Sequence, residues 1–188
     1  IDLTVSGGTT NYTYAWSDGA SYSATTEDIS NLPAATYTCT VTESNGCTVT
    51  GTVAFAVTQP AAALSASSTS VNVLCNGAST GSIDLTVSGG TTNYTYAWSD
   101  GASYTATTAD ISNLPAGTYT CTVTDANSCT TTETVTITEP AVLISTSTMV
   151  MVNCNGGSDG TATAVPTGGT SPYTYLWNDP SAQTTVTA

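Results

Sequence analysis

The sequence predicts an all-β protein built from small β-sandwich domains, and three observations support this prediction. Apolar residues alternate with Thr, Ser and Asn over short segments, as expected for strands that bury one face. Turn-forming sequences such as Asn76-Gly77 and Asp100-Gly101 separate these segments. No segment has a convincing helical period, so we expect strands throughout.

The expected strands are clearest between residues 61 and 140. Their alternating apolar positions are Val71, Val73 and Cys75; Ile83, Leu85 and Val87; Tyr94, Tyr96 and Trp98; Tyr119, Cys121 and Val123; and Val135 and Ile137. Other turn signals lie at residues 88–90, 115–117 and 126–128. About seven short strands in roughly 80 residues are typical of a β-sandwich.

The chain contains repeated copies of one unit. Residues 1–23 and 83–105 differ only at their last position, at an offset of 82 residues. Residues 152–160 resemble residues 73–81 at an offset of 79, and the segment 172–177 resembles 93–98. Self-similarity at a fixed period indicates a repeat architecture.

Two proline-containing seams divide these copies. Residues 58–61 read Thr-Gln-Pro-Ala and residues 138–141 read Thr-Glu-Pro-Ala. We therefore expect a domain at 1–60 that lacks its opening strands, a complete domain at 61–140, and a domain at 141–188 that lacks its closing strands. Because proline stiffens short connections, these domains are expected to lie end to end as a rod, within a longer array.

Two details make the predicted sandwich immunoglobulin-like. Trp98 lies on the third major strand, where such folds bury a Trp between the sheets. Residues 114–121 end in Tyr119-Thr120-Cys121, which matches a tyrosine corner, with Tyr two residues before a Cys. We expect Tyr96, Trp98 and Tyr119 to belong to the core, because they occupy the inward positions of their strands.

Composition excludes several function classes. The 188 residues include no Lys, Arg or His and 13 acidic residues, which gives a net charge of −13. Without cations the chain has nothing to neutralise phosphates, and an anionic membrane surface would repel it. Without His, the Ser/His/Asp and Cys/His catalytic arrangements are unavailable, so we expect no catalytic residues and no enzyme activity. No run of 18 apolar residues is present, so no membrane insertion is expected.

Three motifs occur in an order that resembles a known family. Residues 89–99 read Gly-Gly-x-x-x-Tyr-Thr-Tyr-x-Trp-Ser, residues 110–129 run from Asp-Ile-Ser-Asn-Leu-Pro to Asn-x-Cys, and residues 135–140 read Val-Thr-Ile-Thr-Glu-Pro. This order resembles the SprB-type repeats of large surface adhesins of gliding Bacteroidota. The resemblance implies type IX secretion across the outer membrane, a location in a surface filament, and an adhesive or spacer role. The chain departs from the family pattern at Cys121, at Ser128 and at Asp179-Pro180.

Six cysteines are present, at positions 39, 47, 75, 121, 129 and 154. The absence of Cys-x-x-Cys and of His argues against a zinc site. The resemblance implies a structural disulfide between Cys75 and Cys129, and Cys121 would then be a small buried core residue. The rival pairing joins Cys75 to Cys121.

No cofactor and no metal is expected. Calcium needs about six oxygen ligands gathered together, and the acidic residues here are scattered. They are interpreted mainly as turn residues such as Asp100, although a calcium site combining Glu139 with a loop Asp of the next copy is an alternative.

The sequence thus predicts a structural or adhesive repeat segment of an extracellular bacterial surface filament or giant adhesin. Its expected partners are neighbouring repeats, like chains in a fibre, and glycans or external surfaces, without nucleic acid. One alternative is a multivalent glycan- or surface-binding module in which many weak sites act together. Another is a non-catalytic spacer attached to an enzyme domain elsewhere in the protein.

Overall fold

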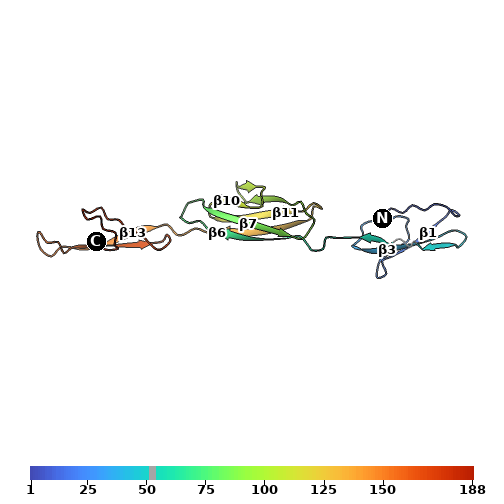
Figure 1. The fold of residues 1–188 in the computed structure, drawn as a ribbon, viewed down its shortest axis with the longest axis horizontal. Coiled ribbons are helices and arrows are strands. Elements are labelled where there is room, and N and C mark those ends of the chain that lie inside the picture. Colours follow the sequence, from blue (N-terminus) through green and yellow to red (C-terminus); the bar gives the residue numbers. More distant parts are fainter. Residues whose placement is uncertain (51–53) are drawn as a thin grey trace. The chain divides into compact units, whose positions relative to one another are not determined.

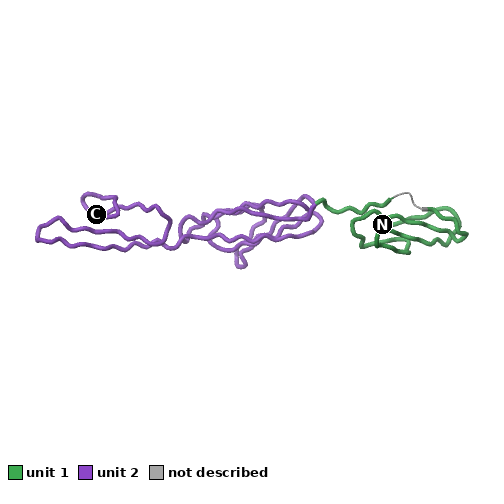
Figure 2. The backbone as a smooth tube through the Cα atoms, turned by 90° about the horizontal axis from the view of Figure 1, so that it is seen from below, with its two compact units in different colours: residues 1–61 green, residues 62–188 purple. Residues whose placement is uncertain are grey.

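The computed structural model describes residues 1–50 and 54–188, and these residues form strands and turns without a helix. The all-β prediction is therefore confirmed. The chain divides into two compact units, residues 1–61 and residues 62–188 (Figure 2).

Residues 62–140 form a sandwich of two antiparallel sheets with the immunoglobulin-like arrangement (Figure 1). The strands are β6 (Ser65–Val71), β7 (Gly81–Ser88), β8 (Thr95–Ser99), β9 (Thr105–Ala106), β10 (Ile111–Leu114), β11 (Gly117–Thr124) and β12 (Thr130–Ile137). One sheet has the order β10-β7-β6 and the other the order β12-β11-β8-β9. The third major strand and the last two strands therefore share a sheet, as immunoglobulin-like folds require.

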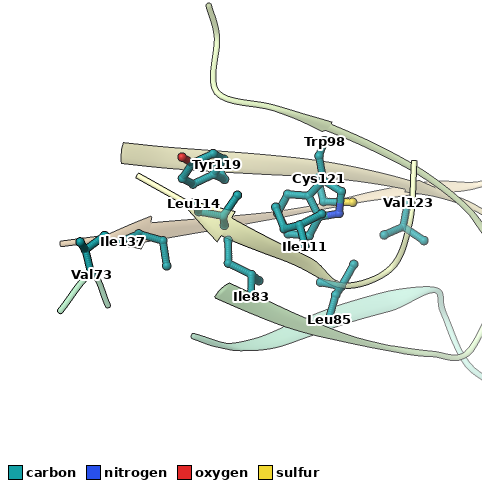
Figure 3. Close-up of a cluster of buried hydrophobic side chains, with 10 residues drawn as sticks. All are labelled: Val73, Ile83, Leu85, Trp98, Ile111, Leu114, Tyr119, Cys121, Val123 and Ile137. Carbon is teal, nitrogen blue, oxygen red and sulfur yellow. The ribbon is translucent and has the colours of Figure 1, made fainter. Parts of the chain in front are cut away.

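The two sheets enclose a core made mainly of inward-facing residues of β7, β8, β10, β11 and β12 (Figure 3). Trp98 on β8 lies opposite Cys121 on β11 in the strand register. Side chains of β7 and β10 meet them from the facing sheet. The buried set is Val73, Ile83, Leu85, Trp98, Ile111, Leu114, Tyr119, Cys121, Val123 and Ile137. All of these residues come from one repeat, so the repeat closes its core without help from its neighbours.

The first predicted strand is shorter than the alternation suggests. β6 ends at Val71, and Val73 and Cys75 lie in the following turn. Gly77 adopts a φ of 74°, a left-handed conformation that glycine reaches without steric cost and that favours a turn here. Val73 still points into the core, whereas Cys75 is exposed. Alternation therefore predicted the environment of Val73 correctly and that of Val71 and Cys75 wrongly, since both are exposed.

Residues 1–61 form a smaller sheet around a second core. Its strands are β1 (Thr13–Ser17), β2 (Ser23–Ala24), β3 (Ala35–Thr42), β4 (Thr48–Thr50) and β5 (Phe55–Val57). β1 and β3 pair as β8 and β11 do, with Trp16 opposite Cys39. Trp16, Ile29, Tyr37 and Cys39 are buried in this unit.

Residues 141–188 contribute β13 (Ile144–Val150) and β14 (Thr161–Thr167), which pair as an antiparallel hairpin. Every residue of β13 is exposed. This segment, predicted as a separate domain from residue 141, belongs to the same compact unit as the complete repeat. It adds no side chain to that unit's buried cluster, which ends at Ile137.

Candidate functional site

Three surfaces of the complete repeat carry ordered polar groups: the outer face of one sheet and the two ends of the sandwich. The outer face of β11 and β12 is a ladder of threonines. The Oγ1 atoms of Thr118 and Thr136 are 3.2 Å apart, and those of Thr120 and Thr134 are 3.1 Å apart. Thr122 and Thr132 follow in register. These hydroxyls pair across the strands and present a neutral, hydrogen-bonding surface to solvent.

The end of the sandwich where the chain enters, here called the leading end, is organised by a buried carboxylate. Asp125 is only 5% exposed. It accepts backbone N–H groups from Thr91 at 2.9 Å, Asn127 at 2.9 Å and Cys129 at 2.8 Å. These donors, led by Thr91, hold the pKa of the Asp125 carboxyl below its usual range despite its burial. Next to this cluster, the Gly90 N–H donates to Ala62 O at 2.9 Å, which ties the incoming chain to the same end.

The opposite end, where the chain leaves, is here called the trailing end. The Val73 N–H donates to Thr138 O at 2.9 Å. The Asn76 side-chain amide donates to Pro140 O at 3.0 Å, and the Gly77 N–H donates to a carboxylate oxygen of Glu139 at 2.6 Å. The loop that carries Cys75 therefore packs against the departing chain. Glu139, considered above as a calcium ligand, has one of its oxygens engaged by Gly77.

The structure corrects the disulfide predicted between Cys75 and Cys129 of one repeat. Both cysteines are free and exposed. Cys75 lies at the trailing end and Cys129 at the leading end, at opposite ends of the eight-residue strand β12. At about 3.3 Å per residue this strand separates them by roughly 26 Å, whereas a disulfide needs Cα atoms within about 7 Å.

The rival pairing of Cys75 with Cys121 does not fit the structure either. Cys121 is fully buried in the middle of β11, opposite Glu133 in the middle of β12. It faces Trp98 in the core, and burial raises the pKa of its thiol. Cys121 thus serves as a small core residue, as the sequence suggested.

The aromatic residues singled out from the sequence lie in or beside the core. Trp98 is 2% exposed and its Nε1–H donates to Thr108 O at 3.0 Å. Tyr119 is 1% exposed and its hydroxyl donates to Pro115 O at 3.0 Å, which confirms the tyrosine corner. Tyr96 is half-buried and packs against the edge of the cluster. None of the three forms an exposed platform.

Asp100 occupies a turn, as its Asp-Gly context indicates. Its Oδ1 accepts the N–H groups of Ala102 at 2.8 Å and Tyr104 at 3.0 Å. These bonds lower the pKa of the Asp100 carboxyl. Asp18 makes the equivalent bonds in residues 1–61.

Sequence reasoning missed the special position of Asp125, which it counted among the scattered turn acids. The available signal was its place directly after the alternating strand that ends at Thr124 and four residues before Cys129. No group of three or more His, Cys, Asp and Glu side chains that could hold a metal ion occurs in the part of the chain that the structure describes. No helix within that part is long and apolar enough to cross a membrane.

Comparison with known proteins matches a family model and solved structures. A family model described as the SprB repeat matches residues 1–21, 67–103 and 146–182, about half of the chain in three segments. A solved structure of an amphioxus IgVJ-C2 molecule aligns with 73% of this chain and 94% of its own, at 20% identity and a TM-score of 0.34. No curated protein matches the chain.

Proposed function

The chain belongs to the SprB repeat family, and we propose on this basis that it is a structural and adhesive repeat segment of an extracellular bacterial surface filament or giant adhesin. The observation that carries the proposal is the threefold family match in a chain whose complete repeat closes its own core. A unit that needs no neighbour to complete its core can be added in further copies, and the protein then becomes longer while the core of each copy stays the same. The motif resemblance to adhesins of gliding Bacteroidota supports the same role.

The surface chemistry of the repeat also supports an exposed, non-catalytic role. The chain carries no Lys, Arg or His, so trypsin-like proteases have no residue to cleave after. The ladder of threonines offers hydroxyl groups without charge, and the net charge of −13 keeps like chains apart in solution. Neighbouring repeats of the same chain are the partners this surface suits best, and contacts between like chains in a fibre would use the uncharged threonine ladder.

Labelling of intact cells tests the proposed location. Antibodies raised against residues 61–140 are expected to bind the surface of unpermeabilised cells that carry the gene, and to decorate filaments by electron microscopy. An antibody against a cytoplasmic protein serves as the control and should label only permeabilised cells. Labelling of the repeat that appears only after permeabilisation would contradict the proposal.

A second candidate function is a multivalent glycan- or surface-binding module, and the threonine ladder is the observation that favours it. Glycan-array binding by the 188-residue chain tests this candidate. Loss of any signal in the variant Thr120→Val plus Thr134→Val, with unchanged unfolding behaviour, would place glycan binding on this face. Absence of binding leaves the structural role as the function.

A further inference from the structure

The complete repeat carries an exposed thiol at each of its two ends. In the complete repeat these are Cys129 at the leading end and Cys75 at the trailing end. Cys47 occupies the turn of residues 1–61 that is equivalent to the turn of Cys129. The Glu43 N–H donates to Cys47 O at 2.9 Å, just as the Asp125 N–H donates to Cys129 O at 2.9 Å. The leading-end position therefore recurs in the chain.

Cys154 is the counterpart of Cys75 in residues 141–188. Gly157 N–H donates to Cys154 O at 2.9 Å, as Ala78 N–H donates to Cys75 O at 3.0 Å. Cys154 is also free and exposed. The trailing-end thiol thus lies in the same exposed turn in two successive copies. In the complete repeat, Cys75 is too far from Cys129 to form a disulfide with it.

The seam between residues 62–140 and 141–188 brings a trailing end next to a leading end. Asn76, one residue after Cys75, donates to Pro140 O at 3.0 Å. Ala141, the next residue along the chain, accepts the Gly169 N–H at 2.8 Å. This second bond is the counterpart of the bond from Gly90 to Ala62 at the leading end of the complete repeat. Pro140 therefore contacts the trailing end of the complete repeat, and the next residue, Ala141, contacts the leading end of the repeat that follows.

We propose that consecutive repeats are crosslinked by a disulfide bond between Cys75 of one repeat and the cysteine that corresponds to Cys129 in the repeat that follows. The bond spans the seam and closes a covalent loop through Pro140. It ties the loop around Asn76 to the turn around Asp125 of the next repeat, and so restrains rotation and bending at the seam. Cys75 and Cys129 of the same repeat take part in two different seams.

The chemistry needs an oxidant, and a small-molecule disulfide such as oxidised glutathione supplies it. The thiolate of one seam cysteine attacks a sulfur of glutathione disulfide, which forms a mixed disulfide and releases one glutathione. The thiolate of the second cysteine then attacks the protein sulfur of the mixed disulfide and releases the second glutathione. The two protons lost by the protein thiols are gained by the two glutathione molecules, so one disulfide is exchanged for another.

The bond depends on the extracellular location proposed above, because disulfides persist in oxidising surroundings. The test is nevertheless carried out on purified protein, so its result is independent of where the protein is found. Failure of surface labelling would remove the proposed location, whereas failure of crosslinking in a glutathione buffer would remove the seam disulfide.

The test uses a tandem chain in which residues 61–140 are followed directly by residues 62–140. Pro140 is then followed by Ala62, as it is followed by Ala141 in the native sequence, and each copy contains a complete core. After equilibration in a glutathione redox buffer, thiol titration of the unfolded chain should show the loss of two thiols relative to the reduced chain. Intact mass should fall by two hydrogen atoms. Residues 61–140 as a single repeat should form no internal disulfide.

Copy-specific substitutions show which cysteines react. Cys75→Ser in the first copy or Cys129→Ser in the second copy should abolish the bond. The same substitutions exchanged between the copies, Cys129→Ser in the first and Cys75→Ser in the second, are matched controls and should leave it intact. All four positions are exposed, so each variant should keep the cooperative unfolding of the parent, which is checked by urea denaturation.

Two results would overturn the proposal. One is a tandem chain that keeps both seam thiols free in the oxidising buffer. The other is a disulfide that also forms in the single repeat 61–140, or that persists equally in the seam variants and in the matched controls, since this would place the bond within a copy. Cys121 is an internal reference, because its buried thiol should react only after unfolding.

Discussion

At the scale of single residues, the complete repeat depends on a few polar groups held at defined positions in an otherwise apolar core. The hydroxyl of Tyr119 is the clearest case, since its ring is buried while its hydroxyl reaches Pro115 O at 3.0 Å. The ring of Tyr104 packs edge-on against it at a centroid distance of 5.4 Å. The bond links β11 to the turn that precedes it and orients the strand that carries Cys121.

Removal of the Tyr119 hydroxyl should destabilise the repeat without changing its fold. We expect Tyr119→Phe to lower the free energy of unfolding by about 1 kcal/mol, the typical net value of one hydrogen bond. Urea denaturation monitored by Trp fluorescence measures the change. The control is Tyr96→Phe on a half-buried ring, which should cost about 0.5 kcal/mol or less. Equal losses in the two variants would argue against a special role for the corner.

Asp125 should make the stability of the repeat depend on pH in the acid range. Its pKa is lower in the folded chain than in the unfolded chain, where it is about 3.9. The stabilisation is therefore present above the unfolded-state pKa and is lost as the pH falls through the lower folded-state value. We expect Asp125→Asn to be less stable than wild type at pH 7 and to show a weaker loss of stability below about pH 4.

Denaturation midpoints measured between pH 7 and pH 2 test this expectation. Asp84→Asn, which changes an exposed carboxylate on β7, is the control and should retain the wild-type decline. Part of the decline should also remain in Asp125→Asn, because the pKa of Asp100 is lowered as well. A wild-type acid profile in Asp125→Asn would contradict the assignment.

At the scale of elements, the turns decide how the strands are brought together. Gly89 lies between β7 and β8 with a φ of +71°, and a Cβ added there would lie 2.0 Å from Ala63 O. Gly101 lies between β8 and β9 with a φ of +78° and open space around it. The two glycines thus share a backbone conformation but differ in how closely another segment approaches.

This difference gives a matched pair of substitutions. Gly101→Ala should cost about 1–2 kcal/mol, the strain of a left-handed backbone at a residue other than glycine. Gly89→Ala should cost more, because the added methyl group also displaces the incoming chain at Ala63. Chemical denaturation of both variants measures the losses. If Gly89→Ala proves no worse than Gly101→Ala, the close approach at Ala63 does not limit stability.

At the scale of the whole molecule, the unbalanced charge is the dominant feature. Thirteen acidic side chains act without one basic side chain, so their mutual repulsion opposes the compact state. Added salt screens this repulsion. We expect the melting temperature to rise with NaCl concentration and to level off toward 1 M, where the Debye length is about 3 Å.

Thermal denaturation followed by circular dichroism checks the salt effect. The control is the same salt series at about pH 3, where protonation removes much of the negative charge and the dependence on salt should weaken. A melting temperature that is independent of salt at pH 7 would show that repulsion among the carboxylates contributes little to stability.

Much of the fold could be predicted from the sequence because its determinants are local. Alternation of apolar and hydroxyl residues assigns Trp98, Tyr119 and Val123 to the interior, and all three are buried. Asp100 could be placed in a turn because an Asp side chain bonds to backbone N–H groups a few residues ahead. The same reasoning failed at Cys75. Strand β6 ends at Val71, so Cys75 lies in the loop that leads into the turn at Asn76-Gly77 and is not part of the alternating strand.

The sequence by itself determined the all-β class, the repeat period, the inward faces of the strands and the family, since each is set by neighbours along the chain. Only the tertiary structure decided which segments lie at which end of the sandwich. It buried Asp125 beside Thr91, set the Asn76 loop against Pro140, and separated Cys75 from Cys129 by the length of β12. The physical reason is that strand pairing joins residues far apart in sequence, so thiol distances depend on strand order and register rather than on spacing.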